Sequence, residues 1–116
     1  MNMSTSITIR KTLRGSLSPK KIRQEEFIEM IEADPGFSWE ESSNKLTATW
    51  HDEEMPGPLD FTLQHDGTID IYFRGSKYDL IVLEKMIQLA GKLKAYVEDS
   101  EGTVFYDPVT GKRKAY

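Results

Sequence analysis

Residues 37 to 73 alternate apolar and polar side chains with a period of two, and this pattern restricts the possible folds more than any other feature. Such alternation is typical of strands that bury one face and leave the other in water. Turn-forming residues interrupt it at Ser42-Ser43-Asn44, Met55-Pro56-Gly57-Pro58 and Asp66-Gly67. The pattern therefore predicts four strands. The apolar positions are Phe37, Trp39, Leu46, Ala48, Trp50, Leu59, Phe61, Leu63, Ile69, Ile71 and Phe73.

Asp66-Gly67 is the strongest hairpin signal among these turns, because Asp-Gly between two alternating runs favours a two-residue connection. A type I′ turn requires positive φ at both central residues. We therefore expect Asp66 and Gly67 to be those two residues, which explains this stretch as a turn.

Two other segments have helical character. Ser18 as a cap, Pro19 at the first helical position and a stop at residues 34–36 predict a helix over about residues 19–33. Ser76 and Asp79 fit a capping box and predict a second helix that ends near residue 94. Its apolar arc covers about half of the helix circumference. Apolar surface left over on this helix would favour a homodimer.

The two ends of the chain add shorter strands. Ile7 and Ile9 predict a strand over residues 4–11, and the turns at residues 100–102 and 107–111 predict one or two strands near the C-terminus. The element order is β-α-β-β-β-β-α-β(β). We expect a single α+β domain over residues 1–116, with a mainly antiparallel sheet, two helices packed on one face, and ends that fray at 1–5 and 112–116.

Composition narrows the classes of function. The chain has no cysteine, which excludes disulfides, thiolate zinc sites and cysteine nucleophiles. No phosphate-binding loop, dinucleotide fingerprint or serine nucleophile elbow is present, so neither a cofactor nor an enzymatic activity is indicated. The start has no apolar leader, and no apolar run is long enough to cross a bilayer. We expect a soluble, cytoplasmic protein that does not enter membranes.

Residues 97–108, VEDSEGTVFYDP, contain four carboxylates, but they do not fit a calcium loop. With Gly102 at the sixth position, Val97 and Pro108 fall where an EF-hand needs acids. Residues 51–54, HDEE, mix imidazole with carboxylates, yet adjacent side chains rarely converge on one ion. We interpret residues 97–108 as a solvated turn followed by a strand and residues 51–54 as a solvated loop, and we predict no metal site.

The charges are strongly segregated along the chain. Residues 1–24 carry +6 with no acid, residues 25–66 carry twelve acids against Lys45, and the whole chain carries −4. The boundary falls inside the helix expected at 19–33, with cations first and acids last. The helix macrodipole favours the opposite order. A binding partner for one of the two charged groups would offset this cost. The simpler alternative is that the basic and acidic groups neutralise each other on the surface of the fold.

Our leading interpretation is a non-enzymatic module that binds a basic surface of a protein partner and masks it, as inhibitors, immunity proteins and chaperones do. We expect Trp39 and Trp50 in the core, and either one would be a candidate anchor of the contact if it is exposed. The partner-binding residues in this interpretation are Glu25, Glu26, Glu29, Glu32, Glu40, Glu41, Asp52, Glu53 and Glu54.

Two alternatives remain open at this level. The first is a nucleic-acid or phosphate-ligand binder whose cations meet the anion at the helix start. Its residues would be Arg10, Lys11, Arg14, Lys20, Lys21 and Arg23. The second is an enzyme that uses several converging carboxylates, with His51 as a further candidate.

Overall fold

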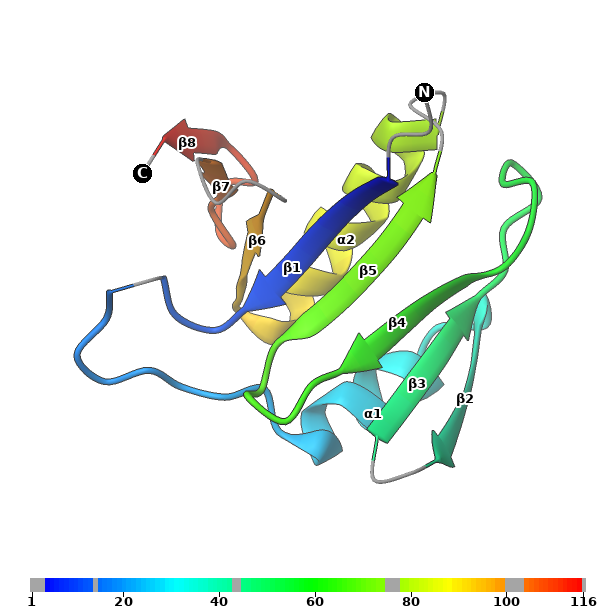
Figure 1. Ribbon diagram of the computed structural model, residues 1–116, viewed down its shortest axis with the longest axis horizontal. Helices are drawn as coiled ribbons and strands as arrows, with labels where there is room; N and C mark the ends of the chain where they lie inside the picture. The colour runs from blue at the N-terminus through cyan, green and yellow to red at the C-terminus, as the bar shows by residue number, and fades with distance from the viewer. Residues whose placement is uncertain (1–3, 14, 43–44, 75–77, 100–103, 116) are drawn as a thin grey trace.

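The protein is described by a computed structural model over residues 4–13, 15–42, 45–74, 78–99 and 104–115. Eight strands form one antiparallel sheet in the order β2-β3-β4-β5-β1-β6-β7-β8, with two helices behind it (Figure 1). This is the α+β architecture that the sequence predicts. The elements are β1 (Ser4–Arg10), α1 (Gln24–Glu32), β2 (Phe37–Ser42), β3 (Lys45–Trp50), β4 (Leu59–Leu63), β5 (Ile69–Arg74), α2 (Asp79–Leu93), β6 (Tyr96–Glu98), β7 (Val104–Tyr106) and β8 (Arg113–Ala115).

The two faces of the sheet differ as the period of two requires. The apolar positions of β1, β3, β4 and β5 whose burial is described are all buried, and they lie on the helix side. On the other face, one row of cross-strand neighbours runs over all eight strands. This row is mainly polar and consists of Glu40, Thr47, Thr62, Asp70, Thr8, Glu98, Phe105 and Lys114.

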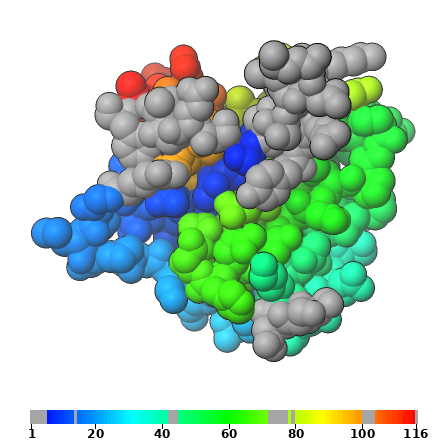
Figure 2. All heavy atoms as spheres, viewed as in Figure 1, coloured from blue at the N-terminus to red at the C-terminus, as the bar shows by residue number. Residues whose placement is uncertain are grey.

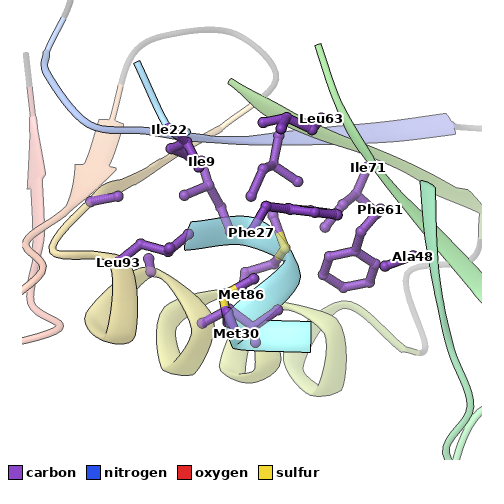
Figure 3. Packing of buried hydrophobic residues seen from close by; sticks show 14 of the residues in the cluster. Ile9, Ile22, Phe27, Met30, Ala48, Phe61, Leu63, Ile71, Met86 and Leu93 are labelled. Carbon is purple, nitrogen blue, oxygen red and sulfur yellow. The ribbon is translucent and has the colours of Figure 1, made fainter. Parts of the chain in front are cut away.

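Both helices bury their apolar stripes against the sheet and meet each other in a single core (Figure 3). Phe27 of α1, Met86 of α2 and Phe61 of β4 are fully buried, and all three side chains lie in this core. Phe61 also makes edge-to-face contacts with Phe37 and Trp50, at centroid distances of 5.2 and 6.3 Å. The central alternating strands thus supply one wall of the core, as expected.

The start of the first helix was predicted wrongly. α1 begins at Gln24, not at Pro19, and Arg23 at its N-cap is extended, with φ −82° and ψ 152°. The preceding chain is held by a tertiary contact, because Ile22 is buried and its N–H donates to the Gly67 carbonyl at 3.0 Å. Burial of Ile22 against the β4–β5 turn therefore overrides the local helix signal.

This shift removes much of the conflict with the helix dipole. Lys20 and Lys21 precede α1, whereas Glu25 and Glu26 occupy its first turn, where carboxylates are favourable. Glu32 at the last helical position remains unfavourable. The electrostatic cost that motivated a bound partner is consequently smaller than the sequence indicates.

The β4–β5 hairpin is present, but its turn type differs from the prediction. Gly67 donates its N–H to the Gln64 carbonyl at 3.0 Å, and Gln64 donates to the Thr68 carbonyl at 2.8 Å. Gly67 has φ +81°, whereas Asp66 does not have positive φ. Asp66 instead accepts bonds from the backbone and hydroxyl of Thr68. The turn is therefore longer than a type I′ hairpin, because Asp66 bonds forward along the chain.

The second helix and the C-terminal strands match the predicted element order, with local differences. Asp79 is the first residue of α2, not the third, and Ser76 lies outside the described residues. Three short strands follow, where one or two were expected. The β7–β8 turn packs on α2, since a Cβ on Gly111 would lie 3.4 Å from Ile87. Among the described residues, neither helix has the length and apolar content needed to span a bilayer.

Candidate protein-binding surface

Eight of the nine predicted partner-binding acids are exposed on three neighbouring elements. Glu25, Glu29 and Glu32 lie on α1, and Glu40 and Glu41 lie on β2. The other three, residues 52–54, lie in the connection from β3 to β4. None of the eight has an ion-pair partner within the described ranges. We call these eight residues the acidic surface: Glu25, Glu29, Glu32, Glu40, Glu41, Asp52, Glu53 and Glu54.

Local packing brings these three elements together. α1 contacts β2, and the N–H of His51 donates to the Gly36 carbonyl at 2.8 Å. The connection after β3 therefore starts beside the short link between α1 and β2. Residues 11–13 and 15–23 project outward on the side of the sheet away from β2 (Figure 1, Figure 2). Most of the N-terminal cations are thus carried away from the β2 edge.

Glu26 is the ninth predicted residue, and it has an internal role. Its carboxylate accepts a bond from Lys11 Nζ at 2.6 Å and bonds from the backbone N–H and Nε of Arg23. The hydrogen bond from Lys11 is the main reason why the pKa of Glu26 is lowered. Glu26 therefore connects α1 to the segments before it, and its carboxylate is less accessible to a binding partner than the other eight.

Asp34 is a second acid of this region with an internal partner. It follows α1 and pairs with Lys85 of α2, and both side chains are 12% exposed. Lys85 also lies over the rings of Phe37 and Trp50, with Nζ at 5.3 and 5.5 Å from their centroids. Burial alone would raise the pKa of Asp34, but bonds from Lys85 and the Gly36 N–H lower it overall. The pair joins α2 to the start of β2.

Replacing Asp34 by asparagine is expected to lower the free energy of unfolding at pH 7 by about 1–3 kcal/mol, because Lys85 loses its buried partner. A carboxyl whose pKa is lowered on folding stabilises the fold above its unfolded pKa, near 3.8. This stabilisation disappears as the pH falls through the folded pKa. In urea unfolding between pH 7 and pH 2, the free energy of unfolding should therefore fall less with decreasing pH in Asp34→Asn than in the natural protein. Glu32→Gln is the control, and equal acid slopes in all three proteins would contradict the assignment.

The two tryptophans have different positions. Trp50 is 4% exposed and belongs to the core, which excludes it as an anchor on the folded protein. Trp39 lies on β2 opposite Ala48 and is 39% exposed. Trp39 is therefore the one of the two that a partner could contact without unfolding the core.

Three of the five described cations of the alternative set lie beside a carboxylate. Arg10 lies 3.8 Å from Glu98, and Lys11 and Arg23 pair with Glu26. Lys20 and Lys21 are exposed, and Arg14 lies outside the described residues. A cleft of about 350 Å³ remains between the chain before α1 and the β4–β5 turn. Its polar lining includes Lys21, Arg23, Gln24, Glu25, Gln64 and His65.

The candidate metal and catalytic residues around His51 lie in the connection between β3 and β4. His51, Asp52 and Glu53 line a shallow hollow beside Pro58. Across the ranges that the structure describes, no three His, Asp or Glu side chains are placed to hold a metal ion. His65 is exposed in the β4–β5 turn.

Glu98 is a buried carboxylate, although the sequence predicted a solvated turn at this point. It is fully buried on β6, in the row of the sheet face that the helices leave uncovered, next to Thr8. The predicted turn at residues 100–102 lies outside the described ranges. The predicted turn at 107–111 is present, and Asp107 accepts hydrogen bonds there from the backbone N–H groups of Val109 and Thr110. The available signal was that Glu98 is two residues from Tyr96, which places both side chains on the same face of a strand and not in a turn. Residue type alone led to the wrong expectation for Glu98.

No match was found in the comparisons of this chain with protein-family models, curated proteins and solved structures.

Proposed function

We propose that the protein is a non-enzymatic binding module that masks a basic surface of a protein partner, in the manner of an inhibitor, an immunity protein or a chaperone. One observation carries the proposal, namely eight exposed acids on adjacent elements without ion-pair partners in the described chain. Residues 24–54 hold ten carboxylates and one lysine. Such a surface attracts a basic partner and selects against acidic ones.

The opposite end of the sheet has the opposite charge. Lys112, Arg113 and Lys114 lie at or beside β8, and all three are exposed. The eight exposed acids of the acidic surface, by contrast, lie at the β2 end. This polarity favours a defined orientation of a basic partner and argues against a uniformly solubilising surface.

Charge reversal at two positions of the acidic surface tests the proposal. We expect Glu29→Lys/Glu40→Lys to reduce recovery of a partner from a native-host lysate at least tenfold, or about 1.4 kcal/mol. The cause is repulsion between the introduced lysines and a basic partner. The measurement is quantitative affinity capture at low and moderate salt, with the natural protein and each variant as parallel baits.

The control is Asp60→Lys/Glu84→Lys, which changes net charge by the same amount on β4 and α2, outside the acidic surface. It should recover the partner as the natural protein does. Equal recovery by both variants, or a recovered protein without a basic surface, would exclude the proposal.

Binding of a phosphate-containing ligand is the second proposal, supported by the cleft beside Lys21. It ranks lower because the Arg23 side chain already bonds to Glu26. Nuclease treatment of the same captures separates a nucleic-acid ligand from a protein partner.

Two further parts of the proposal concern the state of the protein. A cytoplasmic location is supported by the absence of cysteine. A homodimer through α2 is supported by Leu80, which is 72% exposed, and light scattering tests it.

A further inference from the structure

We propose that β2 is a docking edge at which an extended, basic segment of the partner adds as a ninth strand of the sheet. β2 pairs with β3 alone in the described structure and ends the sheet on that side. Its six residues pair with β3 without interruption and contain neither proline nor lysine. Of the features that prevent strand addition, β2 therefore has only charged side chains, Glu40 and Glu41, and a basic segment would neutralise them.

The backbone of β2 presents bonding groups to this edge. Residues 36 and 51 share a ladder bond, since the His51 N–H donates to the Gly36 carbonyl at 2.8 Å. Bonded and non-bonded pairs alternate along an antiparallel ladder. Ser38 and Glu40 consequently bond to β3, whereas Trp39 and Glu41 direct their N–H and C=O groups outward. These two residues supply the donors and acceptors that an added strand needs.

The side chains of β2 specify a basic segment. Glu41 lies on the helix side of the sheet and Glu40 on the other side, because β2 alternates its faces. Both are exposed, so a strand at this edge meets a carboxylate on each of its faces. Two consecutive basic residues in the segment would each face one glutamate.

Trp39 adds a preference for an apolar side chain next to the two basic ones. It shares the helix side with Glu41, and its 39% exposure leaves part of the ring open to a neighbouring strand. In an antiparallel segment, the residue after the two basic ones lies opposite Trp39. An apolar side chain at that position would cover the open part of the indole.

The other open edge of the sheet supports this choice of partner. β8 carries Arg113 and Lys114, with Lys112 just before it. Lys114 lies 3.7 Å from Asp107, whereas Lys112 and Arg113 have no acidic partner among the described residues. These two cations repel a basic segment, so the two edges are not equivalent. Symmetric pairing of two β2 edges is also opposed, because Glu40 and Glu41 would meet their own copies.

The inference rests on the proposed function and names the mode of recognition at the acidic surface. The probe is the peptide acetyl-Thr-Val-Lys-Arg-Val-Thr-amide, and the same peptide with two glutamates in place of Lys-Arg is its control. We expect the basic peptide alone to bind in titrations followed by NMR. Glu40→Gln/Glu41→Gln should weaken its binding about tenfold.

Hydrogen exchange distinguishes strand addition from contact through side chains alone. Saturating peptide should slow exchange of the Trp39 and Glu41 amides at least fivefold in the natural protein. The amides of Ser38 and Glu40 already bond to β3 and should change little.

Two substitutions at one position provide a second test. Glu41→Ala and Glu41→Pro both remove the carboxylate, but only proline removes the outward N–H. Proline is tolerated on an edge strand whose N–H faces solvent. We expect Glu41→Pro to bind the peptide about tenfold more weakly than Glu41→Ala. If the proline variant does not fold, the exchange measurement decides.

Several results would overturn the inference. Absence of peptide binding is one, and equal affinities of the alanine and proline variants without amide protection is another. The second result leaves the acidic surface as a docking site and removes strand addition alone. A third is concentration-dependent self-association of the natural protein that Lys112→Glu/Arg113→Glu/Lys114→Glu abolishes, because a second copy would then occupy β2.

Discussion

Replacing Phe61 by alanine is expected to lower the free energy of unfolding by about 3–5 kcal/mol. Phe61 is fully buried on β4, and its ring makes edge-to-face contacts with Phe37 of β2 and Trp50 of β3. Truncation would leave a cavity between the sheet and α1. Because small domains are stable by about 5–15 kcal/mol, this loss is a large fraction of the total.

Urea unfolding followed by circular dichroism measures the effect as a shift of the midpoint at constant slope. Phe61→Leu is the control, since it keeps most of the volume and should cost less than about 1.5 kcal/mol. A loss below about 1 kcal/mol in Phe61→Ala would mean that the ring does not fill the core as described.

Replacing Gly67 by alanine is expected to lower the free energy of unfolding by about 2–4 kcal/mol, for two separate reasons. Gly67 has φ +81°, which disfavours any residue with a Cβ. An added Cβ would also lie 2.7 Å from the Lys21 Cα and 2.3 Å from its Cβ. The segment before α1 would have to move off the β4–β5 turn, and the burial of Ile22 would suffer.

Gly15→Ala is the matched control, because Gly15 has φ +82° and no atom within 4 Å of an added Cβ. It should cost about 1–2 kcal/mol from backbone strain alone. The difference between the two variants measures the close approach of Lys21 to the turn. Equal losses in both variants would show that contact with Lys21 adds nothing to the cost of a Cβ at residue 67.

The acidic surface was predictable in part. Sequence position identified the acids of residues 25–54, because charge segregation is visible without a fold. It did not distinguish Glu26 and Asp34, whose partners Lys11 and Lys85 come from distant positions in the chain. Ion pairs between distant residues depend on how the elements pack, so they cannot be read from residue spacing.

The edge position of β2 could not be predicted from the sequence either. Alternation predicts a strand at residues 37–42, but it does not say which strands end the sheet. That β2 lies at one end and β8 at the other follows from the order in which the strands assemble. The outward groups of Trp39 and Glu41, and the exposure of Trp39, depend on this order.

The sequence alone determined the class of each main element, because periods of two and of 3.6 residues report directly on which side chains share a face. It also determined the hairpins and the antiparallel character of the central strands. Tertiary structure decided the start of α1, the geometry of the turn at Gly67 and the burial of Glu98. At the start of α1, burial of Ile22 against the distant β4–β5 turn outweighed a local preference, since local preferences are about 1 kcal/mol or less and burial of a side chain can exceed them. The turn at Gly67 differs because Asp66 bonds to Thr68, a detail that residue type alone does not specify.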